Sequence, residues 1–586
     1  MSKYDQSPPS PAEIFALRHV AAGDAPGDLA IRNGRVVHVH TGEIREGDII
    51  IKGRHIAAIT PPGRLAATRE VDANRAYLAP TFIDAHIHIE CTLLSTGELA
   101  RISVPNGTTA LFNDPNGLAN IVGQGGMDWI GSTTTPIRLF EQTTPDVPRR
   151  GGFSEGGAGV TQAQILERLT RPTTVSLGEA NPYLLDEEVA EALSVTISHG
   201  KRVTGHTARL SGEPLWSYLA GGVGDDHNAA TLEEVLDRLR LGAITTLQLG
   251  SMTNYIKGIL GDPGALGLIG SHICFAADDK HVDDLFENGH IDQHVREAVA
   301  VGVDPALAIR MASWNAASHF RVDHLIGSLT PLRLADFQIL PDLADFEPSS
   351  VWVGGEEVAR DGKALFENRD AVPVWVRDTV RLGSRVSQAS IAIPASPGQT
   401  RVRVRAMEMY DGYYKRAFEA ELPVLDGNIA PDPTIDVAKI VILDRHRGSA
   451  EAGIGFVRGF GLTSGALAAT TNCDNGNIVA VGTSDRDLWA AVKALEAMGG
   501  GYVAISDGQV AAELPLPIGG VVSDQPWETV LSQSRGVNEA ARNLGCAIHA
   551  PFMIIAFVGL NGVPDYGLTE RGLIDVPSQQ LIDVVL

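Results

Sequence analysis

The segment LAPTFIDAHIHIE (residues 78–90) contains two histidines, His86 and His88, within an apolar, β-branched run. Side chains two positions apart on a β-strand point to the same face, so both imidazoles can contact one metal ion. The run breaks at Glu90-Cys91-Thr92, and the C-terminal ends of barrel strands are where active sites lie. We therefore predict a metal-binding (β/α)8 barrel whose site begins at this strand.

Short apolar runs alternate with helical patterns from residue 77 to residue 321. ATLEEVLDRLRLG (residues 230–242) and HIDQHVREAVAVG (residues 290–302) are two of these helical patterns. Strand followed by helix, repeated, predicts parallel strands joined by crossover helices, and the interval approaches the roughly 250 residues of a TIM-type barrel. An open doubly wound sheet is the alternative, although no G-x-G-x-x-G follows an early strand.

The regions flanking the predicted barrel have a different texture. Alternating short strands in residues 28–76 and again in residues 322–372 predict one small β-sandwich assembled from both segments. Residues 1–27 form a polar, proline-containing leader. Residues 373–586 mix strands and helices and are interpreted as a separate C-terminal α/β domain, which suits a chain of 586 residues.

Composition excludes several classes of partner. The formal net charge is -24, whereas nucleic acids and anionic membranes attract basic surfaces, so neither is expected to bind. No export signal or apolar span is present in the sequence, and the four cysteines form no CxxC motif. We expect a cytoplasmic, metal-dependent enzyme that acts on a small molecule, and self-association, as a dimer, is plausible.

Four later side chains can complete a metal-binding set. Each follows a short apolar run: Glu179 in TTVSLGE, His206 in KRVTGH, His227 in GGVGDDH and Asp278 in HICFAADDKH. Any one of them alone is more often a loop residue with satisfied hydrogen bonds, but the ordered set HxH, Glu, His, His, Asp is far more specific. Imidazole and carboxylate ligands suit zinc, manganese or iron, and two such ions would lower the pKa of a shared water.

Several longer motifs resemble the adenine deaminase family of the amidohydrolase superfamily. They are IDAHIHIE, GE, GH, DDH, ADDKHVDDLFENGHID (residues 277–292), GSLTPLRLADFQIL, GFGLTSGALAATT, GTSD, MGGGYVAISDGQVAAELPLPIGGVVSD (residues 498–524) and GLTERGLIDV. They extend through the barrel, the β module and the C-terminal domain. The resemblance implies hydrolytic deamination of adenine to hypoxanthine and ammonia, as part of purine metabolism.

The resemblance also implies roles for individual residues. His86 and His88 would bind one metal together with the bridging Glu179 and Asp278, and His206 and His227 would bind the second. The implied cofactors are two divalent ions in a binuclear centre, with manganese or iron favoured and zinc also suitable. Asp278, and Glu179 beside it, would be the catalytic carboxylates, since Asp278 would carry a proton to the departing ammonia.

Three departures from the family pattern lie at positions expected to face the substrate. The family's Asp-Pro-His-Glu is replaced by residues 114–117, Asp-Pro-Asn-Gly; its Asp-His-Glu by residues 226–228, Asp-His-Asn; and its His-Asp-Ser-His-Asn by residues 473–477, Cys-Asp-Asn-Gly-Asn. Either these positions carry little function, or the metal ligands are kept while the groups that contact the substrate have changed.

Other polar residues are candidates for orienting a substrate, although each is equally suited to an ordinary turn. They are Asp114, Asn116, Glu155, Asp279, His281 and Asp474. Glu155 lies in a glycine-rich loop that has the character of a mobile lid or, equally, of an ordinary surface connection. Two functions remain as alternatives to aminopurine deamination: hydrolysis of another cyclic C–N bond, in a cyclic amide or ureide, and a catalytically silent purine-binding role.

Overall fold

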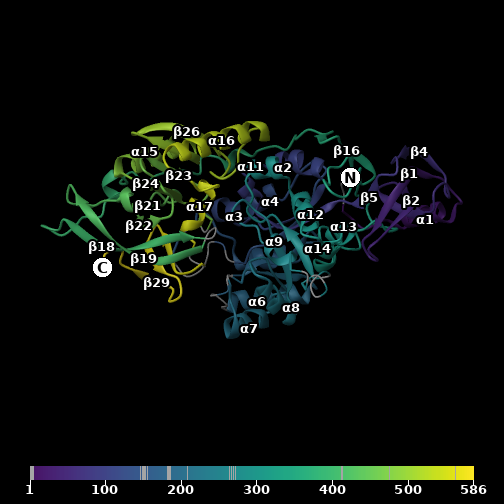
Figure 1. Ribbon diagram of the computed structural model, residues 1–586, viewed down its shortest axis with the longest axis horizontal. Coiled ribbons are helices and arrows are strands. Elements are labelled where there is room, and N and C mark those ends of the chain that lie inside the picture. The colour runs from purple at the N-terminus through teal and green to yellow at the C-terminus, as the bar shows by residue number, and fades with distance from the viewer. Residues whose placement is uncertain are drawn as a thin grey trace.

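The computed structural model describes residues 6–145, 147, 153–154, 156–180, 182, 187–207, 209–262, 264–265, 267, 270, 272–410, 414–473, 475–560 and 563–586. Three parts follow one another along its long axis (Figure 1). A β module lies at one end, a barrel in the middle and the C-terminal domain at the other end. This order predicts that the barrel contacts both of the other parts.

The middle part is a (β/α)8 barrel, which confirms the predicted fold class. Its strands are β6 (Phe82–Ile87), β7 (Thr108–Asn113), β8 (Arg138–Thr143), β9 (Thr174–Ala180), β10 (Arg202–Gly205), β11 (Asp225–Asp226), β12 (Ile244–Gln248) and β13 (Ile273–Ala276). They pair in parallel as a five-stranded and a three-stranded sheet. Gly224 N donates to Val203 O at 2.9 Å and Asp278 N to His86 O at 3.0 Å, so backbone hydrogen bonds close both seams.

Helices surround the barrel strands. They are α2 (Thr96–Ser103), α3 (Asn116–Val122), α4 (Gln124–Ile130), α5 (Gln162–Arg168), α6 (Glu187–Ser198), α7 (Gly212–Ala220), α8 (Leu232–Arg240), α9 (Ile256–Leu260), α11 (Val282–Asn288), α12 (Ile291–Ala300), α13 (Pro305–Met311) and α14 (Trp314–His319). Their starts follow local sequence: Thr231 and Glu234 form a capping box at α8, and Asp304 caps α13 before a proline. Strand, loop and capped helix therefore alternate as predicted.

The β module joins both flanking segments in one nine-stranded sheet. Its strands are β1 (Gly27–His38), β2 (Glu43–Lys52), β3 (His55–Thr60), β4 (Ala67–Asp72), β5 (Tyr77–Pro80), β14 (Phe337–Leu340), β15 (Ser350–Val353), β16 (Glu356–Arg360) and β17 (Lys363–Ala364). The junction is the antiparallel pair β5 and β14, in register at Ala79 and Gln338. Within the predicted leader, helix α1 (Pro11–Ala22) packs Leu17 and Val20 against this sheet.

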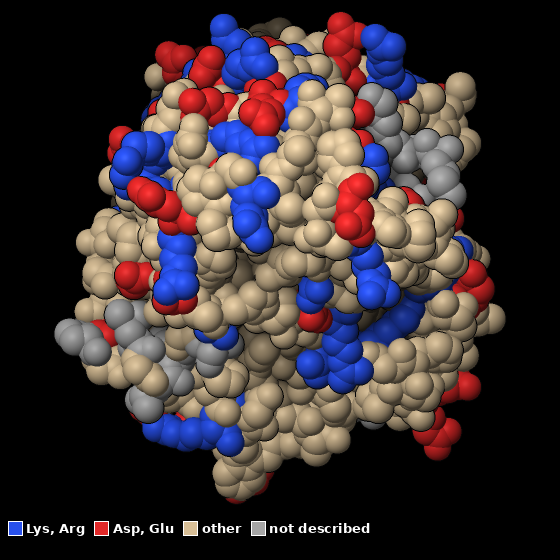
Figure 2. Space-filling model, turned by 90° about the vertical axis from the view of Figure 1, so that its right-hand side faces the viewer, with Lys and Arg blue, Asp and Glu red and all other residues tan. Residues whose placement is uncertain are grey.

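Charged side chains on the β module are paired across the sheet. Figure 2 shows blue and red side chains interspersed on this face rather than gathered by sign. Arg32 with Glu70, at 2.5 Å, and Lys52 with Asp28, at 2.6 Å, are two of the ion pairs. The net negative charge is therefore not focused here into a field of one sign.

The C-terminal domain is built on a second nine-stranded sheet. Its strands are β18 (Arg401–Tyr410), β19 (Tyr414–Leu425), β20 (Asn428–Ile429), β21 (Val437–Leu443), β22 (Ala452–Arg458), β23 (Ala466–Ala469), β24 (Ile478–Gly482), β25 (Gly501–Ser506) and β26 (Gln509–Pro515). Helices α15 (Asp485–Met498), α16 (Trp527–Asn543) and α17 (Pro551–Val558) and the small sheet of β27 (Tyr566–Thr569), β28 (Gly572–Asp575) and β29 (Gln580–Ile582) complete it.

One apolar cluster runs from the barrel into the C-terminal domain without interruption. Polar contacts tie the same interface: Trp527 N donates to Glu98 Oε2 at 3.0 Å, and Ser523 N donates to Leu93 O at 2.8 Å. The C-terminal domain is therefore held firmly over the barrel mouth. Within the described part of the chain, no helix is both long and apolar enough to cross a bilayer.

Candidate metal centre and substrate pocket

The six predicted metal ligands all lie at the C-terminal ends of barrel strands, where the fold brings successive strand ends together. His86 is in β6 and His88 follows it; Glu179 is in β9; His206, His227 and Asp278 follow β10, β11 and β13. Asp278 has a φ of 53°, a left-handed conformation that turns the chain sharply at the end of its strand. Residues separated by almost 200 positions thus converge.

Glu179 is the centre of this cluster. Its Oε1 lies 2.9 Å from His227 Nε2 and 3.1 Å from His86 Nε2. His206 Nδ1 is 3.6 Å and His88 Nε2 is 3.7 Å from the same oxygen. Asp278 Oδ1 lies 3.5 Å from His88 Nε2, so the two carboxylates and four imidazoles face a common volume.

Buried atoms left without hydrogen bonds provide a test of whether this cluster fits a cation. Among the described residues, His86 Nε2, His227 Nε2 and Asp278 Oδ1 are buried and have no hydrogen-bond partner. Leaving such a group unpaired costs about 1–3 kcal/mol, unless an ion satisfies it. Two groups have candidate ligand atoms that all lie within 4.8 Å of one another: His86, Glu179, His227 and Asp278, and His88, Asp278 and Asp279. The donor set therefore fits divalent cations.

A second set of contacts orients the predicted ligands. His86 Nδ1 lies 2.6 Å from Gln142 Oε1, and His88 Nδ1 lies 2.6 Å from Asp114 O. Both acceptors select the tautomer that leaves Nε2 available for a metal. Gln248 Nε2 donates to Asp278 Oδ2. The ligand motifs in the sequence predict neither Gln142 nor Gln248; the only signal is an amide near the C-terminal end of a barrel strand, and both side chains are buried.

Burial and neighbouring charges shift the pKa values of the acidic groups. Burial alone would raise the pKa of Glu179, but the His206 and His227 imidazoles beside it bring that pKa well below its usual range. Burial raises the pKa of Asp114 to about 6, and it also raises that of Asp278, where the neighbouring Asp279 adds to the effect. A cation would oppose the rise at Asp278 by favouring the ionised carboxylate.

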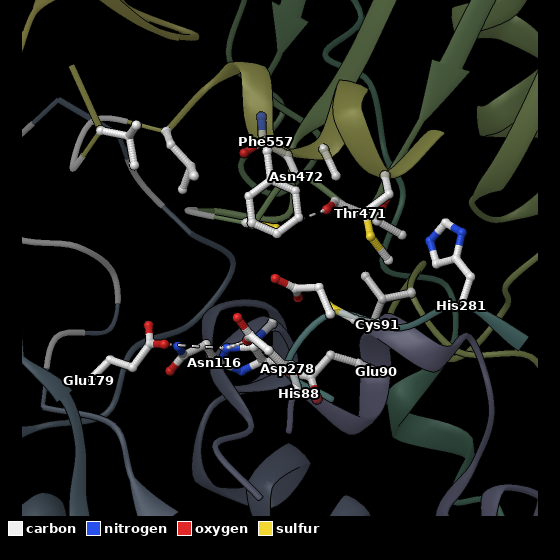
Figure 3. Close-up of a pocket in the computed structure, with 18 of the residues that line it drawn as sticks. His88, Glu90, Cys91, Asn116, Glu179, Asp278, His281, Thr471, Asn472 and Phe557 are labelled. Carbon is white, nitrogen blue, oxygen red and sulfur yellow. Dashed lines mark hydrogen bonds and ion pairs between the residues drawn. The ribbon is translucent and has the colours of Figure 1, made fainter. Parts of the chain in front are cut away.

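A pocket lies directly over the cluster, between the barrel and the C-terminal domain (Figure 3). His88, Glu179 and Asp278 form part of its floor. Its opposite wall comes from the C-terminal domain and is largely apolar. That wall includes Tyr502, Val521, Met553, Ala556, Phe557, Leu560 and Val563. The pocket is therefore polar on the metal side and apolar on the other, which suits a flat, partly polar ring.

The structure separates the predicted substrate-orienting residues into groups. Asn116, Asp279 and His281 line the pocket. Asp114 instead lies behind the floor, where its Oδ2 accepts a hydrogen bond of 3.0 Å from Glu179 N. Glu155 and Asp474 lie outside the described residues, as do residues 148–152 of the predicted lid loop. Of the described part of that loop, Ser154 is buried and its Oγ donates to Glu570 Oε2 at 2.8 Å. The binding roles of all six stay predictions.

Comparison with known proteins identifies the family. Residues 77–358 match the model of the amidohydrolase family, and residues 413–580 match the adenine deaminase C-terminal domain. An adenine deaminase of Desulforamulus reducens is 36% identical over 98% of this chain and 99% of its own length. One of Moorella thermoacetica is 35% identical over 97% of each chain. The chain belongs to the adenine deaminase family.

A solved adenosine deaminase from Xanthomonas campestris, with bound zinc, is 16% identical, has a TM-score of 0.45 and covers 58% of this chain and 94% of its own.

The departures from the adenine deaminase pattern cluster near the pocket. Asn116, Gly117 and Cys473 line it. Asn228 is buried, and its N donates to Asp226 Oδ1 at 3.0 Å.

Proposed function

We propose that this protein is a metal-dependent hydrolytic deaminase that converts adenine, or a related aminopurine, to the corresponding oxopurine and ammonia. The observation that carries the proposal is a cluster of buried imidazole and carboxylate atoms, three without hydrogen bonds in the described chain, beneath a pocket. The full-length similarity to proteins named adenine deaminase supports the choice of substrate.

The proposed cofactors are two divalent ions, manganese or iron. His86 and His88 would hold one with Glu179 and Asp278, while His206 and His227 would hold the other. Bound there, such ions would lower the pKa of water toward neutrality and so supply a nucleophile. Glu179 suits a bridging position, because its Oε1 is within 3.7 Å of a nitrogen atom of each of the four histidines.

The chain's own residues would position the ring and move the protons. Asp278 is proposed to accept a proton from the attacking water and deliver it to the departing amine, which leaves as ammonia. The hydrogen bond from Gln248 fixes the other Asp278 oxygen and so aims the reactive one. Phe557 and Leu560 would cover the face of the ring and exclude bulk water.

Ammonia release tests this proposal. The protein is reconstituted separately with manganese, ferrous iron and zinc, and incubated with adenine, other aminopurines, cyclic amides and ureides. We expect ammonia from adenine with manganese or iron, and none from His86→Ala under the same conditions. Two metals per chain with no turnover of any aminopurine would overturn the proposal. Turnover of a cyclic amide instead would establish the alternative hydrolase.

We also propose that the protein works in the cytoplasm as a homo-oligomer, in the simplest case a dimer. The net charge of -24 supports the absence of nucleic-acid and membrane partners. Sedimentation velocity of the reconstituted protein gives the assembly state. A monomer at micromolar concentration would contradict the oligomer.

A further inference from the structure

Three oxygen atoms on the polar side of the pocket have no hydrogen-bond partner among the described residues. They belong to Glu90 (Oε2), Asn116 (Oδ1) and Asp279 (Oδ1), and all three residues line the pocket. Figure 3 shows Glu90 and Asn116 on the same side as His88 and Asp278, opposite Phe557. A wall of unpaired acceptors favours a ligand whose edge carries N–H donors.

Glu90 is the best fixed of these groups. It is only 4% exposed, and its Oε1 accepts hydrogen bonds from Gly117 N at 2.6 Å and Leu118 N at 3.3 Å, in the first turn of α3. Both donors bind the same oxygen. The other oxygen, Oε2, is consequently held in one orientation, and it is buried without a hydrogen-bond partner among the described residues.

Gly117 leaves room for Glu90 in this position. A Cβ atom at residue 117 would lie 3.0 Å from both Cγ and Oε1 of Glu90, closer than side chains normally approach. Any side chain at residue 117, the glutamate of the family pattern included, would therefore require the Glu90 side chain to shift by a few tenths of an ångström. The loss of an acid at 117 and the placement of the carboxylate of Glu90 are linked by this contact.

We propose that Glu90 is a specificity-determining residue that accepts a hydrogen bond from a ring or amino N–H of the heterocycle, in the place of the acid missing at residue 117. The inference rests on the proposed function and names the group by which the same pocket would recognise an aminopurine. Glu90 acts here as a fixed hydrogen-bond acceptor beside the metal centre.

The variant Glu90→Gln tests this role with little change in shape. Gly117 N and Leu118 N require an oxygen in front of them, so the glutamine amide must turn its NH2 toward the pocket. A donor then faces the N–H of the substrate. We expect kcat/KM for adenine to fall about 10- to 100-fold, with metal content and melting temperature close to those of the parent protein.

Two further variants separate recognition from structural effects. Glu90→Ala should lose kcat/KM to at least the same extent, and Glu90→Ala with Gly117→Glu should recover at least about 10-fold of it, because the new carboxylate enters the vacated space. Glu98→Gln is the matched control: like Glu90, Glu98 is a buried barrel glutamate that accepts a hydrogen bond from a backbone N–H, that of Trp527, but it does not line the pocket. It should change stability and leave kcat/KM unchanged.

The outcomes distinguish a failure of the role of Glu90 from a failure of the proposed function. Wild-type kcat/KM in Glu90→Gln, with adenine turned over normally, would overturn the role of Glu90 and leave the proposed function standing. If the parent protein releases no ammonia from adenine, the proposed function fails, and calorimetric titration with hypoxanthine decides about Glu90. Binding that is weakened about 10-fold or more in Glu90→Gln supports the role; equal binding, or none in either protein, overturns it.

Discussion

Two buried groups of histidines and carboxylates share barrel strand β6, and they differ in how well their atoms are paired. In one, His290 Nε2 lies 2.7 Å from Asp84 Oδ2 and His290 Nδ1 lies 3.0 Å from Ser103 Oγ. The other Asp84 oxygen accepts from His86 N and Ala277 N, at 3.2 and 3.1 Å. Every polar side-chain atom of this Asp84–His290 group is therefore satisfied within the protein.

The metal cluster has the same residue types but does not satisfy itself. Its nitrogen and oxygen atoms converge at 2.9–3.7 Å around Glu179, and three of them have no hydrogen-bond partner among the described residues. Residue type and burial are therefore common to both groups; what distinguishes the candidate metal cluster is that its unpaired atoms face one another. The Asp84–His290 group joins β6 to the N-terminus of α12, and this supports the strand that carries His86.

Removing a ligand should produce the largest effect. We expect His227→Ala to lose metal and nearly all turnover, because its Nε2 is one of the atoms closest to Glu179. Metal analysis of the purified protein, with ammonia release, measures both losses. Full metal content and activity in this variant would show that His227 is not a ligand. The unpaired atoms of the cluster would then not indicate metal binding.

Residues that orient the ligands should have a smaller effect. Gln248→Ala removes the hydrogen bond to Asp278 and is expected to lower metal affinity or kcat by about 10- to 100-fold. Gln338→Ala is the matched control, because Gln338 is also a buried glutamine, with its Nε2 donating to Pro80 O at 3.0 Å, but it lies in β14 of the β module. It should lower stability alone. Equal losses of metal affinity in the two variants would contradict this orienting role.

A substitution in the Asp84–His290 group should lower stability and leave metal binding intact, the opposite of what is expected for the metal cluster. His290→Leu leaves the Asp84 carboxylate buried without its imidazole partner, which should cost about 3–5 kcal/mol of unfolding free energy. Metal stoichiometry of the folded protein should be retained. Chemical denaturation of the metal-loaded protein and metal analysis test this pair of outcomes. Unchanged stability together with lost metal would show that His290 belongs functionally to the metal cluster.

The sequence predicted the barrel and the converging ligands for a physical reason. Strand ends such as IDAHIHIE and TTVSLGE combine a local apolar pattern with an ionisable residue at its end, and a parallel barrel must gather those ends at one face. No such local pattern predicts the apolar wall that the C-terminal domain adds to the pocket. Phe557 lies in the apolar helix α17, almost 470 residues from His88, and only the docking of the C-terminal domain brings the two together.

Glu90 and Asp114 illustrate the same limit from the other direction. Each is an acid just after a barrel strand, but only Asp114 is among the residues that the sequence suggests for orienting a substrate. The structure places Glu90 in the pocket wall and Asp114 against the backbone of Glu179. The backbone N–H groups of Gly117 and Leu118 hold Glu90 there, and the missing side chain of Gly117 leaves it room. Hydrophobic periodicity contains no signal for such contacts.

The pocket histidine His281 is expected to affect stability alone, and only at acidic pH. It lines the pocket beside the apolar wall, with its Nε2 3.2 Å from Tyr502 Oη, and burial lowers its pKa to about 4. In the unfolded chain an ordinary imidazole titrates near pH 6.5 and binds a proton that the native state excludes until about pH 4. Stability should therefore fall as the pH drops from 6.5 to 4, with roughly 3 kcal/mol of that loss due to His281. In His281→Gln the decline measured by denaturation across this window should be smaller by about that amount. Parallel stability profiles for the two proteins would mean that His281 is protonated in the native pocket.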